Sequence, residues 1–237
     1  MSVYQAPVTY QFDGIYLPSE VSSYLLVSVP SELRPPTGRR ILSWIRNGLM
    51  APERRSTPGR DLLMNFEDLV TCQAITLLLQ AGFSIRAIRR AEALFAEIFK
   101  TPKPFAYHEV WYSLPDIFGR ADGQLISGTK GGQYALGFVG KWATPLRARL
   151  AFSKSTGIAE CWRPRLGIAL KPDIQFGQPC VDGTRIPTGS IWSYVKGGDT
   201  IPYVADSFGL EVADVKRAFY WEERRRTGLQ ATVKVPA

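Results

Sequence analysis

The stretch from Gly177 to Thr188 constrains the fold of this chain most strongly, because turn-forming residues recur in it at short intervals. Gly177-Gln178-Pro179 and Asp182-Gly183 are turn signals, and they flank the short apolar pair Cys180-Val181. This order predicts two chain reversals on either side of one brief extended segment. A Thr-Arg-Ile-Pro sequence follows directly, and Thr188 is expected to cap a helix.

Three short helices are expected after this stretch. The first carries Ile191, Trp192 and Val195 at the spacing of one buried face, and a pair of glycines at 197–198 ends it. The second is capped by Thr200 and ends at Gly209, and residues 211–223 support the third. Three short helices with tight turns predict a helix-turn-helix-like bundle. The expected inward residues of the third helix are Val212, Val215, Phe219 and Tyr220.

This C-terminal stretch resembles the DUF433 family of small trihelical modules, which occur as antitoxin components of Vap-type toxin–antitoxin operons. The family pattern joins a G-x-P…GTR-x-P entry to a helix break of the type GG-D/E-T, which residues 197–200 match. The resemblance implies an antitoxin whose partner is a PIN-domain ribonuclease toxin with an acidic, metal-binding site. The residues that match the entry are Gly177, Pro179, Gly183, Thr184, Arg185, Ile186 and Pro187.

Two roles stay open for Arg185 within this entry. Its guanidinium could contact a phosphate, or it could donate hydrogen bonds to the carbonyl groups of the turn, since the planar fork of arginine suits both kinds of acceptor. The contact with the turn is the favoured interpretation.

Positive charge is concentrated in separate segments. The formal net charge is +8, which favours a polyanionic partner. Residues 31–60 hold seven arginines against two glutamates, and residues 140–171 hold seven lysines and arginines against one glutamate. A third cluster, expected to follow the last helix, is the candidate toxin-binding segment: Arg224, Arg225 and Arg226. The rival candidates lie in the middle of the chain: Arg147, Arg149, Arg163 and Arg165.

Two helices and a basic turn are expected between Pro18 and Met64. The first helix begins at Pro18, and Thr37-Gly38 opens the second, which ends at Gly48. Residues 53–60 form an arginine-rich turn, and residues 62–64 return as a strand. The expected inward residues are Val21, Tyr24 and Leu25 in the first helix and Ile41, Leu42 and Ile45 in the second, with Trp44 at the edge.

This order resembles the winged helix-turn-helix of the MerR class, with Gly48, Leu49 and Pro52 at the positions of its Gly-Leu-x-x-Pro motif. The long dimerisation helix of that class is not expected, because prolines interrupt the chain soon after Lys100. The resemblance implies double-stranded operator DNA as a partner and a homodimer on palindromic half-sites. The expected DNA-binding residues are Thr37, Arg39, Arg40 and Arg46 on the recognition helix and Arg54, Arg55 and Arg60 on the wing.

The middle of the chain changes from helical to β-rich patterns. Helices are expected over 66–80 and, after a cap at Ser84, over a stretch with a broad apolar stripe that is expected to be buried within its own domain. The surplus width of this stripe could alternatively form a dimer face. The glycine-rich segment 128–132 lacks the spacing of a phosphate-binding loop and predicts a hairpin turn. Strands are expected over 107–112, 124–127, 133–139 and 146–152, and Asp116 is expected to serve a loop.

The expected fold class is α+β, mainly α. We expect a MerR-like DNA-binding domain with an N-terminal arm over residues 1–102, a β-rich region over 103–170, and a DUF433-like trihelical domain with a basic tail over 171–237. One histidine and three scattered cysteines predict no catalytic, cofactor or metal site. The N-terminus predicts no signal peptide, and no apolar run is long enough to span a membrane, so a cytoplasmic location is expected.

The function that these patterns favour is that of a type II, Vap-type antitoxin. It would neutralise a PIN-domain ribonuclease toxin and bind operator DNA to autoregulate its operon. Two alternatives stay open: a MerR-like transcriptional regulator without a toxin partner, and an architectural protein that bends DNA.

Overall fold

The computed structural model describes residues 13–28, 35–52, 62–107, 110–121, 124–134, 144–145 and 149–233. The described helices are α1 (Pro18–Ser28), α2 (Gly38–Arg46), α3 (Phe66–Gln80), α4 (Ile85–Phe99), α5 (Pro104–Tyr107), α6 (Thr188–Lys196), α7 (Ile201–Phe208) and α8 (Val212–Val233), with a 3-10 turn η2 (Gln175–Gly177). The described strands are β1 (Val110–Ser113), β2 (Asp116–Ala121), β3 (Gln124–Ser127), β4 (Thr144–Pro145), β5 (Leu150–Phe152), β6 (Ala159–Arg165), β7 (Ile168–Leu170) and β8 (Cys180–Val181).

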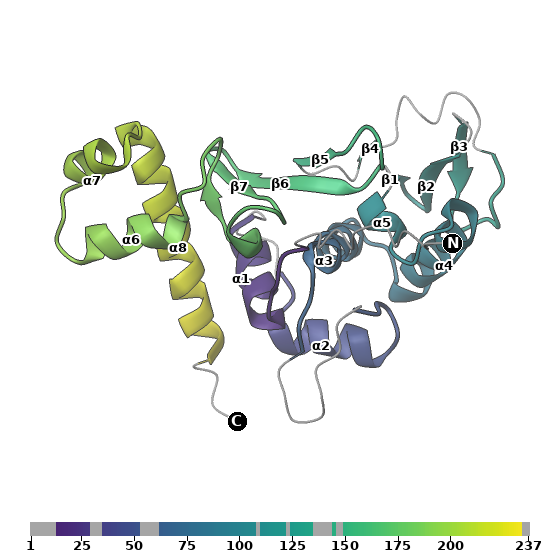
Figure 1. Cartoon of the computed structure of the whole chain (residues 1–237). Helices are drawn as coiled ribbons and strands as arrows, with labels where there is room; N and C mark the ends of the chain where they lie inside the picture. The colour runs from purple at the N-terminus through teal and green to yellow at the C-terminus, as the bar shows by residue number, and fades with distance from the viewer. Residues whose placement is uncertain are drawn as a thin grey trace, which may run out of the picture.

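The molecule is elongated and has three parts side by side (Figure 1). Helices α6, α7 and α8 form one end, α4 and the sheet of β1, β2 and β3 form the other, and α1, α2 and α3 lie between them under β6 and β7. The fold class is α+β, mainly α, as the sequence predicted.

The helices predicted in the N-terminal half are confirmed, and so is the predicted cap of α4 at Ser84; Thr37, expected to open α2, is its N-cap. The side chains of Thr37 and Ser84 accept hydrogen bonds from the backbone N–H groups three residues later, at 3.2 Å each. Two assignments within α2 were wrong, because Trp44 is buried whereas Leu42 is 37% exposed. Trp44 therefore belongs to the inner face of α2, and Leu42 is on its outer side.

The first sheet covers the apolar stripe of α4, and two glycines make this contact close. The strand order is β3-β2-β1-β4. A Cβ atom at Gly119 would lie 2.8 Å from Cζ of Phe99, and one at Gly128 would lie 2.7 Å from Cζ of Phe95. Only glycine allows this spacing, so the stripe is packed within its own chain, as expected.

Asp116 organises the turn that follows β3. Asp116 was expected in a loop, but it is the buried first residue of β2. Its Oδ2 atom accepts from the Ser127 hydroxyl at 2.5 Å, and its Oδ1 atom accepts from the backbone N–H of Thr129 at 3.2 Å. The predicted turn over residues 128–132 is present and is held by this carboxylate.

The second sheet has the order β5-β6-β7-β8, and β6 lies against α1 and α3. Strands β6 and β7 were not predicted from the sequence; within them, Trp162 and Leu170 are buried and are cross-strand partners. Because β8 pairs with β7, the domain boundary expected at residue 170 falls inside this sheet.

The C-terminal bundle contains the three predicted helices, with three corrections. Thr188 does not cap α6; it is the first residue of that helix, follows the N-cap Pro187, and is buried. The third helix, α8, continues to Val233, well past the predicted end. Its buried face contains Val215, Ala218 and Trp221, whereas Val212 and Tyr220, both expected inward, are 40% and 61% exposed. Within the described residues, no helix is both long and apolar enough to cross a membrane.

Candidate nucleic-acid interface

Helix α2 packs against α1 in a helix-turn-helix arrangement. The hydroxyl of Ser22 on α1 donates to the carbonyl oxygen of Pro36, at 2.8 Å, just before α2 begins. A Cβ atom at Gly38 would lie 3.3 Å from the Cα of Ser19, so glycine lets the first turn of α2 approach α1. Ile41 and Trp44 are buried on the inner side. The orientation of α2 is therefore fixed by the inner face, and its outer side is left open.

The three arginines predicted on α2 lie on this outer side. Arg39, Arg40 and Arg46 are exposed, and none of their guanidinium groups makes a hydrogen bond or an ion pair with another described residue. Arg39 and Arg46 are seven residues, or about two turns, apart, so they project from the same side of the helix. Thr37 is placed at the N-cap, where the helix dipole adds partial positive charge. Free cations at such a helix end can contact phosphate groups or guanine edges.

The other end of α2 is anchored by α4. The guanidinium of Arg89 donates to the backbone carbonyl of Asn47 at 2.6 Å, directly after the last turn of α2. Gly48 follows with a φ of +66°, a left-handed conformation that turns the chain back into the core. The backbone of Leu49 then donates to the carbonyl of Trp44 at 2.9 Å. Both ends of the candidate recognition helix are thus held by neighbouring elements.

The predicted wing falls largely outside the described residues. Arg54, Arg55 and Arg60 belong to the segment 53–61, so their expected role stays a prediction. The return of the chain after that segment is described. Met64 forms an antiparallel bridge with Tyr16, with backbone hydrogen bonds of 2.8 Å and 2.9 Å in the two directions.

Two of the three arginines in the C-terminal cluster are engaged inside the protein. Arg225 donates two hydrogen bonds to Oε2 of the buried Glu222, at 2.6 Å and 3.1 Å, and Arg226 donates one at 3.2 Å. Arg226 also stacks on the ring of Trp192, with its Cζ atom 3.8 Å from the ring centroid. Arg224 is exposed, so only this member of the cluster presents a free guanidinium to a partner.

This network also explains why the cluster was misread from the sequence. The arginines were expected in a tail after the last helix, whereas they lie within α8. The spacing of three and four residues from Glu222 to Arg225 and Arg226 puts the three side chains on one face of a helix. This spacing is visible in the sequence and indicates that Glu222 can bind Arg225 and Arg226 if the segment is helical.

The glycine that opens the C-terminal family motif is required by a contact with the N-terminal part. Gly177 has a φ of +83°, and a Cβ atom there would lie 2.0 Å from the hydroxyl oxygen of Tyr16. The Tyr16 hydroxyl instead donates to the carbonyl oxygen of Gly177 at 3.0 Å. Gly177 is therefore fixed both by its backbone conformation and by the close approach of Tyr16.

The remaining motif residues shape the turn into α6. The hydroxyl of Thr184 donates to the carbonyl of Val181 at 2.8 Å, and Gly183 has a φ of +80°. The carbonyl of Pro179 accepts from the backbone of Thr188 at 2.9 Å, and Pro187 is the N-cap of α6. These contacts give the motif a structural role.

The interpretation of Arg185 as a brace for this turn was wrong. Its side chain is exposed and makes no hydrogen bond with a described residue; only its backbone carbonyl is used, by the Gln175 side chain at 3.1 Å. The guanidinium is thus available to a ligand, which leaves the phosphate contact as a prediction.

The rival candidates in the middle of the chain separate into different sites. Arg147 lies outside the described residues, and Arg163 is paired with Asp182 at 2.7 Å. Arg149 and Arg165 line a groove beside α8 together with Arg224. The tertiary structure thus brings members of both candidate clusters to one surface. Lys216 and Arg217 on α8 also line it, and the sequence analysis did not single them out.

Comparisons with known proteins identify two separate parts of the chain. A family model described as MerR HTH family regulatory protein matches residues 36–93, which cover α2, α3 and much of α4. A model described as a protein of unknown function, DUF433, matches residues 168–220. No curated protein matches the chain. The X-ray crystal structure of Rv2018 from Mycobacterium tuberculosis is similar in fold, with a TM-score of 0.59 and 16% identity over 86% of this chain and 95% of that one.

The helix-turn-helix geometry and the MerR match together indicate a DNA-binding regulator rather than an enzyme. The regulator carries a second part of the DUF433 type, whose description assigns no function.

Proposed function

We propose that the protein binds operator DNA sequence-specifically, with α2 in the major groove. The observation that supports this most directly is the set of exposed arginines on a helix whose inner face and both ends are fixed. Arg39, Arg40 and Arg46 would contact guanine edges or phosphates, each good bidentate base contact contributing about 1–3 kcal/mol of discrimination. The wing residues Arg54, Arg55 and Arg60 would contact phosphates on the adjacent backbone.

We further propose that the protein binds DNA as a homodimer. Regulators with a helix-turn-helix commonly match the two-fold symmetry of the dimer to half-sites about one helical turn apart. Because the apolar stripe of α4 is covered by the first sheet, the dimer contact of this protein would lie elsewhere than on that stripe.

We also propose that the regulator is the antitoxin of a Vap-type operon and neutralises a PIN-domain ribonuclease. The match of residues 168–220 to DUF433 supports this proposal through the resemblance of that family to antitoxin modules. The toxin contact would use Arg224 rather than Arg225 and Arg226, because Glu222 already engages the latter two. Autoregulation would follow from binding of the same protein to its own promoter.

The DNA-binding part is tested by replacing Arg39 and Arg40 with alanine and measuring affinity for the promoter of its own operon at several salt concentrations. Each lost phosphate contact should lower the slope of log affinity against log salt by about 0.9, so both affinity and slope should fall. The matched control replaces Lys100 and Lys130, exposed lysines beyond the far end of α4 and on the turn after β3. Unchanged binding by the α2 variant would show that α2 is not the recognition helix.

The antitoxin part is tested by co-purification with the product of the adjacent gene, scored for a stable complex and for suppressed RNA cleavage. A complex that silences a ribonuclease supports the antitoxin role. If the neighbour is no nuclease and no complex forms, the antitoxin role is excluded and the DNA-binding regulator remains. Strong bending of many unrelated DNA sequences would instead favour an architectural protein.

A further inference from the structure

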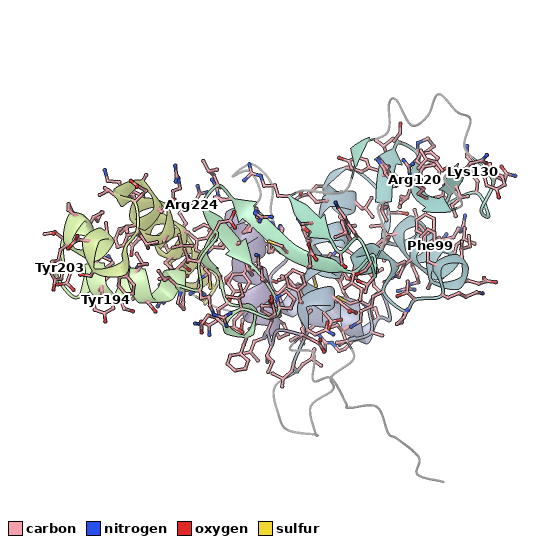
Figure 2. The ribbon with its side chains drawn as sticks, turned by 45° about the horizontal axis from the view of Figure 1, so that its top comes forward. Phe99, Arg120, Lys130, Tyr194, Tyr203 and Arg224 are labelled. Atoms are coloured by element: carbon pink, nitrogen blue, oxygen red, sulfur yellow. The ribbon has the colours of Figure 1, made fainter. Side chains whose placement is uncertain are left out.

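A groove with a volume of about 460 Å³ runs between α8 and the hairpin of β6 and β7. Arg224 on α8 lies toward the middle of the molecule, away from the bundle's outer end, where Tyr194 and Tyr203 lie (Figure 2). One wall of the groove is the outer face of α8, with Lys216, Arg217 and Arg224, and the other comes from the second sheet, with Arg149 and Arg165. The groove therefore exists only because the C-terminal bundle is docked on this sheet.

Among the described residues, all the charged side chains that line this groove are cationic. Among them, Arg217 is neutralised by Asp214, whose carboxylate is 2.6 Å away. Lys216 and Arg224 are exposed and make no ion pair with a described residue. The pKa of Arg165 is lowered by partial burial and by the positive charges of Arg224 and Arg149. Like charges held together in this way favour an anionic ligand, which would relieve their repulsion.

The surface between these cations is apolar. Ile168 and Trp221 are buried at the floor, whereas Leu166 and Tyr220 are 74% and 61% exposed. Exposed apolar side chains beside a concave floor are typical of a site that receives another apolar side chain. A ligand that satisfies both features has carboxylates to meet the cations and an apolar group to cover Leu166 and Tyr220.

The walls of the groove are held rigidly. The Nε atom of Arg165 donates to the carbonyl oxygen of Val27 at 2.6 Å, which ties the end of β6 to the end of α1. At the turn after β6, a Cβ atom at Gly167 would lie 2.8 Å from Cδ of Arg217, so this turn touches α8 directly. The carbonyl of Gly167 also accepts from the backbone of Asp182 at 3.0 Å. A preformed site of this kind loses little conformational entropy on binding.

We propose that this groove binds an acidic, amphipathic segment of a partner protein, in which a leucine-sized or aromatic side chain lies between carboxylates. The identity of that partner as a toxin rests on the proposed antitoxin function. A protein segment fits better than a DNA backbone, because phosphates would meet the cations but leave the apolar surface of Leu166 and Tyr220 uncovered.

The test uses the full chain and a short fluorescein-labelled peptide of glutamates and aspartates with two leucines, followed by fluorescence anisotropy. The groove variant replaces Lys216 and Arg224 with glutamate; the control variant replaces Lys100 and Lys130 with glutamate and so changes the net charge equally. Arg217 is left unchanged because it is paired with Asp214. The groove variant should weaken binding about tenfold or more, and the control variant should not. Circular dichroism and urea unfolding verify that each variant is folded.

Two further probes separate the contribution of the apolar surface to peptide binding from that of the charged side chains. A peptide with serines in place of the leucines, and the variant Leu166→Ser, should each bind more weakly if the apolar surface takes part. A short duplex of random sequence should bind the wild-type protein and the groove variant equally. The proposal is overturned if the leucine peptide does not bind better than the serine peptide, if both charge variants lose binding equally, or if the groove variant loses duplex binding instead.

The experiments give different results if the groove proposal is wrong and if the proposed antitoxin function is wrong. If the adjacent gene product is neutralised equally by the wild type and the groove variant, and the peptide is unaffected by the substitutions, the groove proposal falls and the antitoxin role stands. If no ribonuclease partner exists but the peptide binds at the groove, the antitoxin role falls and the site serves another acidic partner. Operator binding, tested through Arg39 and Arg40, is independent of both.

Discussion

Glu222 is a buried carboxylate at the contact between two helices of the C-terminal bundle. Its carboxylate is 1% exposed, and it accepts hydrogen bonds from Arg225, from Arg226 and from the hydroxyl of Thr188, the last at 2.6 Å. A buried carboxylate is stable only when such partners replace the water it has lost. Thr188 is on α6 and both arginines are on α8, so the carboxylate joins the two helices.

Replacement of Glu222 by glutamine should therefore destabilise the protein. The amide cannot neutralise two arginines, and we expect the free energy of unfolding in urea to fall by about 1.5–3 kcal/mol. The control is Glu211→Gln, an exposed carboxylate just before α8, which should change stability by less than about 0.5 kcal/mol. Equal stability of the two variants would mean that the network around Glu222 contributes nothing measurable.

At the scale of elements, the packing of the first sheet on α4 is set by glycine. A Cβ atom at Gly128 would lie 2.7 Å from Cβ of Ala91 and 3.1 Å from its Cα, which is backbone and cannot move aside alone. Because the φ of Gly128 is not positive, the conflict is one of space rather than of backbone conformation. The absence of a Cβ atom at residue 128 thus allows the close approach of β3 to α4.

Gly128→Ala should separate these elements and cost about 1–3 kcal/mol, the usual range for overpacking. Thermal unfolding followed by circular dichroism measures this loss. Gly189→Ala is the matched control, since its nearest neighbour would be the Nη2 atom of Arg226 at 3.9 Å and the residue lies in α6. Alanine should be neutral or slightly stabilising there. A loss of stability at Gly189 but not at Gly128 would contradict this account.

At the scale of the whole molecule, Tyr16 connects the N-terminal and C-terminal parts. It bridges to Met64, packs edge-on against Tyr24 with ring centroids 6.2 Å apart, and donates to Gly177 at the entry of the C-terminal motif. The neighbouring amide of Ile15 donates to the carbonyl of Phe176 at 3.1 Å. The two regions that match different families are therefore joined through a buried contact rather than only by the chain between them.

Tyr16→Phe should weaken this connection by about 1–3 kcal/mol, because the carbonyl of Gly177 loses its buried donor. Hydrogen exchange should accelerate together at the amides of Ile15 and Thr188, which lie on the two sides of the contact. The exposed Tyr203 provides the control, and Tyr203→Phe should leave exchange at both amides unchanged. Acceleration on the N-terminal side alone would show that the two parts open independently.

The sequence by itself predicted the features that depend on residues a few positions apart. The start of α2 at Thr37-Gly38, the caps at Ser84 and Thr200 and the glycine ends at Gly48 and Gly209 are all found in the structure. Each is set by hydrogen bonds between backbone groups and side chains within one helical turn, so the chain carries the information locally.

Only the tertiary structure decided which polar groups meet across long separations. Residue types alone gave no reason for Thr188 to donate to Glu222, 34 residues further along the chain, instead of capping α6. The groove of Arg149, Arg165 and Arg224 arises because α8 docks beside the second sheet. Such pairings are set by packing between elements far apart in the chain. A buried polar group without a hydrogen-bond partner costs free energy, so the partners that packing brings near it determine which pairs form. Local sequence patterns do not encode that packing.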